Sequence, residues 1–150
     1  MSTELKIRRA RSQDVAVCCK ILNAWIDETD WMPRVHSAKE IATFYNTIVF
    51  QSRKLFVAET ARKVGGFMAL NDDGLVQALY VGDGYRRRGI GGHLIARAKA
   101  ESEDHVSLWS FQANKDAQKF FLRHGFVESN RTDGDNEEGL PDLLFEWRAP

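Results

Sequence analysis

The stretch from residue 75 to residue 100 limits the fold of this chain more than any other part of the sequence. Residues 75–81 are rich in side chains that favour strands, and residues 89–100 carry apolar side chains at the spacing of one helix face. Only a short turn rich in Arg and Gly separates the two segments. A strand must therefore pass almost directly into a helix, which predicts a fold that mixes strands and helices.

The rest of the chain predicts further strands and helices. Asp73-Gly74 is typical of a tight turn, and residues 60–63 form a second one, so three consecutive antiparallel strands are expected. The predicted strands are residues 4–9, 55–59, 64–70, 75–81, 105–111, 126–128 and 143–147, and the predicted helices are residues 15–25, 38–50, 89–100 and a segment between Asn114 and Gly125. No repeat or linker interrupts this order, so we expect one domain over residues 1–150.

Charge and composition exclude several functions. The chain has 21 Lys and Arg against 21 Asp and Glu, whereas nucleic-acid binding requires a surplus of basic residues. No apolar run approaches the roughly 18 residues of a membrane span, and the first nine residues lack the apolar stretch of a signal peptide. Cys18 and Cys19 are adjacent and offer no zinc spacing. We therefore expect a cytoplasmic protein with no metal, and with neither nucleic acid nor membrane as a partner.

The turn at residues 86–92, Arg-Arg-Arg-Gly-Ile-Gly-Gly, is suited to binding an anion. The first backbone N–H groups of a helix have no partner within the helix and lie at the positive end of its dipole, so they can hold a phosphate. Gly91 and Gly92 should each cost about 1 kcal/mol relative to Ala in a helix, which indicates that backbone access matters here. A helix start with solvated arginines is the alternative interpretation.

Two other phosphate-binding motifs do not fit these residues. Gly84 and Gly89 have the separation of a Walker A loop, but Ile90 and Gly91 stand where Lys and Ser or Thr are required. A dinucleotide fingerprint needs glycine where Leu94 stands, and the preceding strands are predicted to be antiparallel. A nucleoside triphosphatase and a dinucleotide-dependent enzyme are therefore disfavoured.

The same residues resemble the GNAT superfamily of acyl-CoA-dependent N-acyltransferases. The acyl-CoA signature of that family is Gln or Arg, two residues, Gly, one residue, then Gly or Ala, which Arg86 to Gly91 fits. A later family pattern of Asn, Ala, two aromatics and Gly-Phe is matched by Asn114, Ala117, Phe120, Phe121, Gly125 and Phe126. The order of predicted elements is also similar. The resemblance implies an α/β fold of the α+β type, with a mixed, mostly antiparallel sheet of six to seven strands and helices on both faces.

The resemblance also implies how the acyl donor, acetyl-CoA, would lie. Residues 86–92 would hold its pyrophosphate, and residues 79–81 would pair with its pantetheine arm. The thioester would lie where the fourth and fifth strands separate, with an amide near Leu79 stabilising the charge that develops on its carbonyl. The cofactor-binding residues implied in this way are Leu79, Tyr80, Val81, Arg86, Arg87, Arg88, Gly89, Ile90, Gly91, Gly92, Asn114, Phe120 and Phe121.

One position departs from the family pattern. Many members carry tyrosine as the second aromatic of the later motif, where it is placed to protonate the departing thiolate, but this chain has Phe121. A thiol pKa near 8.5 makes an unassisted thiolate a tolerable leaving group, so turnover need not be lost. Tyr80 is a candidate for the missing acid, and the alternative is that it packs in the core. His36 is a candidate for the base, and the alternative is that it is a solvated surface residue.

Glu59 is a poor candidate for the base. The two predicted turns place Glu59 opposite Val64, and Val64 opposite Val81, at the pyrophosphate end of the sheet. The same pairing places Met68 near Gln77, toward the acceptor side, where the strands carry no carboxylate. A base would then come from a loop.

Two loops are candidates for the acceptor site. In the resembled fold the connection between the first two helices covers this site, and here it contains Glu28, Asp30, Trp31, Arg34 and His36. The alternative to an acceptor wall, which the residues favour equally, is a charged surface loop held in place by Trp31. Residues 129–142 form an acidic loop that would attract a cationic amine or simply be solvated, and its spacing does not fit a calcium loop.

We therefore predict an N-acetyltransferase that moves an acetyl group from acetyl-CoA to the primary amine of a small molecule or peptide by direct attack. The alternative is a CoA-binding regulatory or interaction module without turnover, because of Phe121. The residues do not identify the acceptor, and a homodimer stays open.

Overall fold

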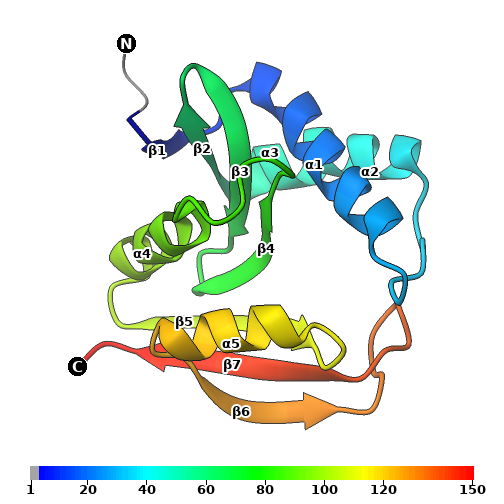
Figure 1. The fold of residues 1–150 in the computed structure, drawn as a ribbon, viewed down its shortest axis with the longest axis vertical. Helices are drawn as coiled ribbons and strands as arrows, with labels where there is room; N and C mark the ends of the chain where they lie inside the picture. Colours follow the sequence, from blue (N-terminus) through cyan, green and yellow to red (C-terminus); the bar gives the residue numbers. More distant parts are fainter. Residues whose placement is uncertain (1–3) are drawn as a thin grey trace.

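The computed structural model describes residues 4–150 (Figure 1). The strands are β1 (Lys6–Arg9), β2 (Lys54–Thr60), β3 (Lys63–Leu70), β4 (Leu75–Val81), β5 (His105–Phe111), β6 (Val127–Thr132) and β7 (Asp142–Arg148). The helical segments are η1 (Ser12–Asp14), α1 (Val15–Glu28), α2 (Ala38–Phe44), η2 (Tyr45–Val49), α3 (Phe50–Ser52), α4 (Ile90–Ser102) and α5 (Lys115–Arg123). Every predicted element is present, but α1 continues beyond Trp25 and β6 continues through four residues that the sequence predicted as loop.

The strands form one seven-stranded sheet in the order β1-β2-β3-β4-β5-β7-β6. Neighbouring strands are antiparallel except β4 and β5, which are parallel. This parallel contact is short, because only Leu75 with Ser107 and Val76 with Leu108 are paired. The mixed, mostly antiparallel sheet is the one that the sequence predicted. It is divided into two halves that meet only where the first two residues of β4 pair with the middle of β5.

Helices cover both faces of the sheet and enclose two cores (Figure 1). On one face, α1 and the helix that runs from α2 to α3 bury Cys18, Leu22 and Tyr45 against the sheet. On the other face, α4 and α5 bury Leu94 and Phe121. Removing this apolar surface from water is the main force that holds the helices on the sheet.

Both cysteines belong to the core. Cys18 and Cys19 are free thiols on the buried side of α1. Burial raises the pKa of Cys18 to about 12, and it raises the pKa of Cys19 as well. Both thiols therefore stay protonated near neutral pH, and their role is to pack in the core.

The second predicted helix forms, but with a local irregularity. Ser37 caps it, because its Oγ accepts from the Glu40 N–H at 3.1 Å while Glu40 Oε1 accepts from the Ser37 N–H at 2.8 Å. The middle of the helix, η2, is a single wide π-helical turn. Tyr45 and Val49, at the two ends of η2, are both buried.

The pairing of β3 with β4 differs from the predicted one. The sequence predicted Met68 near Gln77 and Val64 opposite Val81. The structure pairs Met68 with Leu79 and Gly66 with Val81, so Leu79 and Val81 each lie opposite a residue of β3 two positions later than expected. Part of the shift comes from Gln77, an extra residue of β4 without a partner in β3, which makes a β-bulge. The bulge inverts the alternation of side chains along β4 and so decides which residues of its second half face α1 and which face α4.

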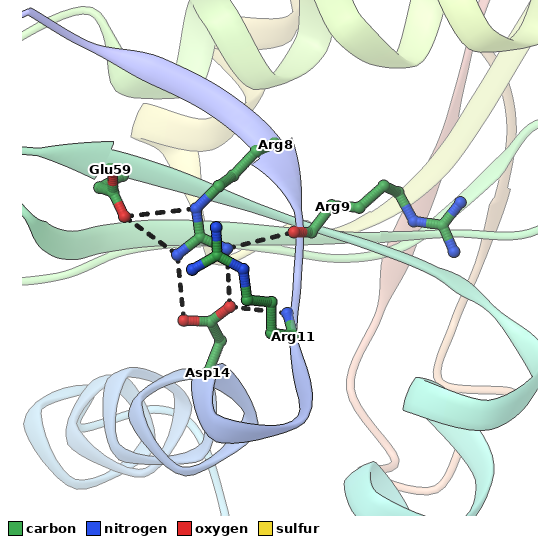
Figure 2. A network of polar contacts seen from close by, with 5 residues as sticks. All are labelled: Arg8, Arg9, Arg11, Asp14 and Glu59. Atoms are coloured by element: carbon green, nitrogen blue, oxygen red, sulfur yellow. Dashed lines mark hydrogen bonds and ion pairs between the residues drawn. The ribbon is translucent and has the colours of Figure 1, made fainter.

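Figure 2 shows an ion cluster that joins β1, η1 and β2. Arg8 lies between two carboxylates, with Nη1 2.8 Å from Asp14 Oδ2 and Nη2 3.0 Å from Glu59 Oε1. The hydrogen bond from Arg8 holds the pKa of Asp14 below its usual range. Glu59 pairs with Val64 as predicted, and its carboxylate is taken up by Arg8. It is therefore not available as a catalytic base.

Residues 4–150 contain neither a candidate membrane span nor a candidate metal site. None of the helices in this range combines the length and the apolar character that a membrane crossing requires. Within the same range, no three His, Cys, Asp or Glu side chains gather in a way that could hold a metal ion.

Candidate functional site

A cleft of about 730 Å³ opens where β4 and β5 separate. Residues 76–81 of β4 and residues 108–111 of β5 form its walls, with the C-terminal end of α1 and one side of α5 beside them. Since the two strands pair only at Leu75 and Val76, the remaining edge of β4 has no neighbouring strand. The cleft therefore runs along an open strand edge inside the sheet.

Backbone groups of β4 point into this cleft. The Gly82 N–H donates to Gly65 O at 2.7 Å, toward β3. Main-chain groups alternate between the two edges of a strand, so those of Leu79 and Val81 point away from β3 and toward the cleft. Arg86 Nε accordingly donates to Val81 O at 3.3 Å.

A second hollow of about 660 Å³ adjoins the first, around the start of α4. The two hollows share Val81, Arg86, Arg87, Phe120 and Arg123 among their lining residues. Together they form one path from the open edge of β4 to the N-terminal end of α4.

The start of α4 is open toward the second hollow. Its first internal hydrogen bond runs from the His93 N–H to Gly89 O at 3.1 Å, so the N–H groups of residues 90–92 precede that bond. Gly89 has φ of 79°, a left-handed conformation that glycine adopts without strain, and it has no side chain that could cap the helix. The positive end of the helix dipole and three main-chain donors therefore remain available for an anion.

Two glycines of this turn also make room for α5. A Cβ on Gly91 would lie 3.1 Å from the ring of Phe120, and a Cβ on Gly92 would lie 3.0 Å from the ring of His124. The sequence suggested backbone access as the reason for these glycines. The structure adds close packing of α5 against the first turn of α4.

The structure brings all but one of the predicted cofactor residues to the two hollows. The residues that line them are Leu79, Tyr80, Val81, Arg86, Arg87, Gly89, Ile90, Gly91, Gly92, Asn114, Phe120 and Phe121. Arg88 is the exception, because its guanidinium lies over the ring of Tyr85, 5.5 Å from the centroid. Asn114 also caps α5, since its Oδ1 accepts from the Ala117 N–H at 3.1 Å.

The two aromatic residues that bear on proton transfer lie on opposite faces of the sheet. Phe121 is buried against Phe126 and Phe145, with ring centroids 5.9 and 5.7 Å away. Tyr80 packs on the α1 side, 5.2 Å from the ring of Trp25. Burial raises the pKa of Tyr80 to about 12, and the negative charge of Glu138 adds to this effect.

His36 does not join the other predicted site residues. It is absent from the residues that line either hollow within the described chain, and its Nε2 donates to Glu137 Oε2 at 2.6 Å. This pair joins the connection between α1 and α2 to the loop between β6 and β7, and Figure 1 shows these two segments meeting beside the open end of the sheet. The hydrogen bond to Glu137 raises the pKa of His36.

A row of aromatic rings closes the end of the cleft opposite α4. Trp31 lies between Trp25 of α1 and Phe111 of β5, with centroids 5.8 and 5.7 Å away. Trp25 and Phe111 also line the cleft. The sequence pointed to Trp31 but not to Trp25 or Phe111. The only signal for those two residues was an aromatic residue near the end of a predicted helix and another at the end of a predicted strand.

The loop between β6 and β7 is held by hydrogen bonds rather than by apolar packing. Buried Asp142 accepts from Thr132 Oγ1 at 2.5 Å and from Asn136 Nδ2 at 3.1 Å. Thr132 Oγ1 in turn accepts from the N–H groups of Gly134 and Asp135, both at 3.2 Å. These bonds fix the acidic loop beside the connection between α1 and α2.

The two ends of the cleft differ in charge. Arg86, Arg87, Lys119 and Arg123 line the end near α4 and α5. At the other end, residues 27–37 and 133–141 together contain seven Asp or Glu against one Arg. An elongated anion suits the first end, and a cation suits the second.

A sheet divided between two parallel strands, with a helix start rich in Gly and Arg beside the division, is the architecture of acyl-CoA-dependent acetyltransferases. The family model described as an acetyltransferase (GNAT) domain matches residues 26–147. The chain belongs to the GNAT family, as the sequence motifs had indicated. Among curated proteins, none matches this sequence.

Several solved structures share the fold of this chain. The apo form of YjaB from Escherichia coli is 22% identical, with 96% of this chain and 97% of that chain covered and a TM-score of 0.78. An N-acetyltransferase from Staphylococcus aureus Mu50 is 19% identical over 97% and 98% of the two chains, with a TM-score of 0.77. YncA from Salmonella typhimurium, solved with its cofactor acetyl-CoA, is 18% identical over 98% of each chain, with a TM-score of 0.77.

Proposed function

We propose that this protein transfers an acetyl group from acetyl-CoA to the primary amine of a small molecule or peptide. The observation that carries the proposal is the continuous path from the open edge of β4 to the open start of α4. Pantetheine is a thin chain with amide groups, which can pair with the main chain of Leu79 and Val81. The pyrophosphate then reaches the N–H groups of residues 90–92 and the side chains of Arg86 and Arg87.

The reaction we propose is direct attack. The amine nitrogen forms a bond to the thioester carbonyl carbon, the carbon–sulfur bond breaks, and coenzyme A leaves as the thiolate. Negative charge develops on the carbonyl oxygen before the bond breaks, and the N–H of Leu79 is directed to the side of β4 where this oxygen would lie. The role of the main chain is to stabilise that charge.

The thiolate leaves without a strong acid in this proposal. Phe121 has no proton to give. Tyr80 has a pKa of about 12, well above the value near 8.5 of a thiol, so proton transfer from its phenol to the thiolate is unfavourable. We therefore assign Tyr80 a hydrogen-bonding and packing role beside the sulfur, and solvent the role of final proton donor.

The attacking amine must lose a proton, because an alkylammonium titrates near 10.4. His36 is held by Glu137 at the junction of two loops, so we assign it to loop positioning. Glu138 of the same acidic loop acts on the pKa of Tyr80, which lines the cleft. A carboxylate of this acidic loop, acting directly or through water, is the base that we favour.

The cofactor site is tested by thermal melting with acetyl-CoA. We expect acetyl-CoA to raise the Tm of the wild type, and Gly89→Glu to abolish the rise by placing a carboxylate against the pyrophosphate. Gly89→Ala is the matched control, because it carries the same backbone strain at φ of 79° without the charge. An equal rise in Tm for the wild type and Gly89→Glu would refute the site.

Turnover is tested separately, by thiol release with a panel of amines, peptides and aminoglycosides. Release that depends on an acceptor supports the enzyme and rejects the alternative of a CoA-binding module without turnover. Binding without release across the panel favours that module, for which the replacement of tyrosine by Phe121 is the supporting observation. A cytoplasmic location and a homodimer remain predictions from the sequence.

A further inference from the structure

An ion pair links the two ends of the cleft. Glu28, the last residue of α1, has its Oε2 3.7 Å from Nη2 of Arg86 in the turn before α4. Both residues line the cleft, and their side chains are 49% and 48% exposed. Glu28, at the acceptor end, is therefore paired with Arg86, which the phosphates of acetyl-CoA would bind.

The position of Glu28 is electrostatically unfavourable within its own helix. A helix C-terminus carries partial negative charge, and a carboxylate there is disfavoured. The last turn of α1 contains no basic residue, and Asp27 adds a second carboxylate. Glu28 thus depends on a cation from outside α1.

The neighbouring carboxylate, Asp27, is paired with Arg34, which lies outside the phosphate-binding turn. Arg34 Nη2 donates to Asp27 Oδ1 at 3.0 Å, and Arg34 Nη1 donates to Asn23 Oδ1 at 2.9 Å and to His36 O at 3.0 Å. These contacts stay within α1 and its following loop, so cofactor binding does not disturb them. Glu28 differs from Asp27 because its partner belongs to the phosphate-binding turn.

We propose that Glu28 exchanges partners during the reaction cycle. It pairs with Arg86 in the free protein, it is released when the pyrophosphate of acetyl-CoA takes up Arg86, and it then binds a positively charged group of the acceptor. The inference rests on the proposed function. Cofactor binding thereby completes the acceptor site by freeing a carboxylate in a cleft that Trp25 also lines, and the ring of Trp25 contacts that of Trp31. Aromatic rings of this kind favour an ammonium.

The charged group that Glu28 binds is not the nitrogen that reacts. A carboxylate in contact with an ammonium raises the pKa of that ammonium, whereas the attacking nitrogen must lose its proton. Glu28 therefore selects acceptors that carry a second basic nitrogen. Diamines and polyamines are the substrate class that this arrangement fits.

The first test measures acetyl-CoA binding by titration of the wild type, Glu28→Gln and Asp30→Asn. Glu28→Gln removes the competitor for Arg86, so we expect acetyl-CoA to bind about twofold to fivefold more tightly, the range of an exposed ion pair. Asp30→Asn removes the same charge two residues away, at a position for which no contact with Arg86 exists, and should bind as the wild type does. Equal affinity in the two variants would overturn the partner exchange.

The second test compares putrescine with n-butylamine, which share a four-carbon chain but differ in the second amine. We expect kcat/KM of the wild type to favour putrescine by about fivefold to tenfold, and Glu28→Gln to remove most of that preference through KM. Equal rates for the two amines, or no rate with either, would overturn the acceptor class. If the wild type fails to bind acetyl-CoA at all, the proposed function itself fails; if all three proteins bind it alike, only this inference fails.

Discussion

At the α4 end of the cleft the main-chain donors come from one continuous stretch of chain, whereas at the α1 end the binding groups come from four separate segments. The first end uses main-chain N–H groups of residues 90–92, with nearby arginines as additional charge. The second end uses side chains from α1, the loop that follows it, β5 and the loop between β6 and β7. Main-chain donors suit a ligand part that never changes, and assembled side chains suit the part that defines specificity.

Among substitutions that test the difference between the two ends of the cleft, we expect the largest effect from Gly91→Val, at the α4 end. A branched side chain on a Cβ that would lie 3.1 Å from the Phe120 ring must push α5 away from α4. Overpacking of this kind costs about 1–3 kcal/mol of unfolding free energy, and the displaced donors should lower acetyl-CoA affinity by about tenfold or more. Denaturant melts and a binding titration measure both quantities.

Gly91→Ala is the milder version of this substitution, and we expect smaller losses of stability and of acetyl-CoA affinity than for Gly91→Val. Its Cβ occupies the same place without the branches, and the gain in helix propensity offsets part of the crowding. An affinity that survives Gly91→Val would mean that the main-chain donors are not the groups that bind the cofactor.

An intermediate effect, confined to the other end, is expected from Trp31→Ala. The variant loses ring contacts to Trp25 and Phe111, each worth about 0.5–1.5 kcal/mol. We expect kcat/KM for the acceptor to fall by about fivefold to tenfold while the Kd for acetyl-CoA stays unchanged. Phe44→Ala, which truncates an exposed ring on α2, is the control. A parallel loss of acetyl-CoA affinity in Trp31→Ala would show that the two ends are not separate.

The smallest effect is expected from His36→Gln, and it depends on pH. The folded protein raises the pKa of His36 above its ordinary value of 6.5, so the stabilisation from its pair with Glu137 is fully present below that value and is lost as pH rises through the raised pKa. The Tm difference between wild type and variant should therefore be larger at about pH 6 than at about pH 9, and at most about 2 °C because the pair is exposed. A difference that grows with pH would contradict the ion pair.

The two ends also differ in how far the sequence could predict them. The turn at residues 86–92 is local, and its order of Arg and Gly is itself the signal, so six of its seven expected cofactor residues line the hollows. Arg88 does not line either hollow, because the direction of a long exposed side chain depends on its neighbours, here the ring of Tyr85. The acceptor end depends on contacts between distant segments, so Trp25 and Phe111 gave no recognisable pattern.

The sheet was predicted in its elements and in the pairing of Glu59 with Val64, but not in the register of β3 with β4. The strands and their order follow from period-two alternation and turn residues. The shift of β3 against β4 depends partly on the bulge at Gln77, which no residue type specifies. His36 was similarly unpredictable, because its partner Glu137 lies 101 residues away in the sequence.

The open edge of β4 has a consequence for self-association. Unpaired strand edges recruit strands from other molecules, and proteins avoid this by covering or charging them. Here Trp25 and Phe120 line the cleft that contains the edge. The unpaired edge of β4 therefore lies inside the sheet and is partly covered by these rings, which limits its access to strands of other molecules. Truncating both rings should make the free protein prone to cross-β growth at high concentration, and a ligand that fills the position should suppress that growth.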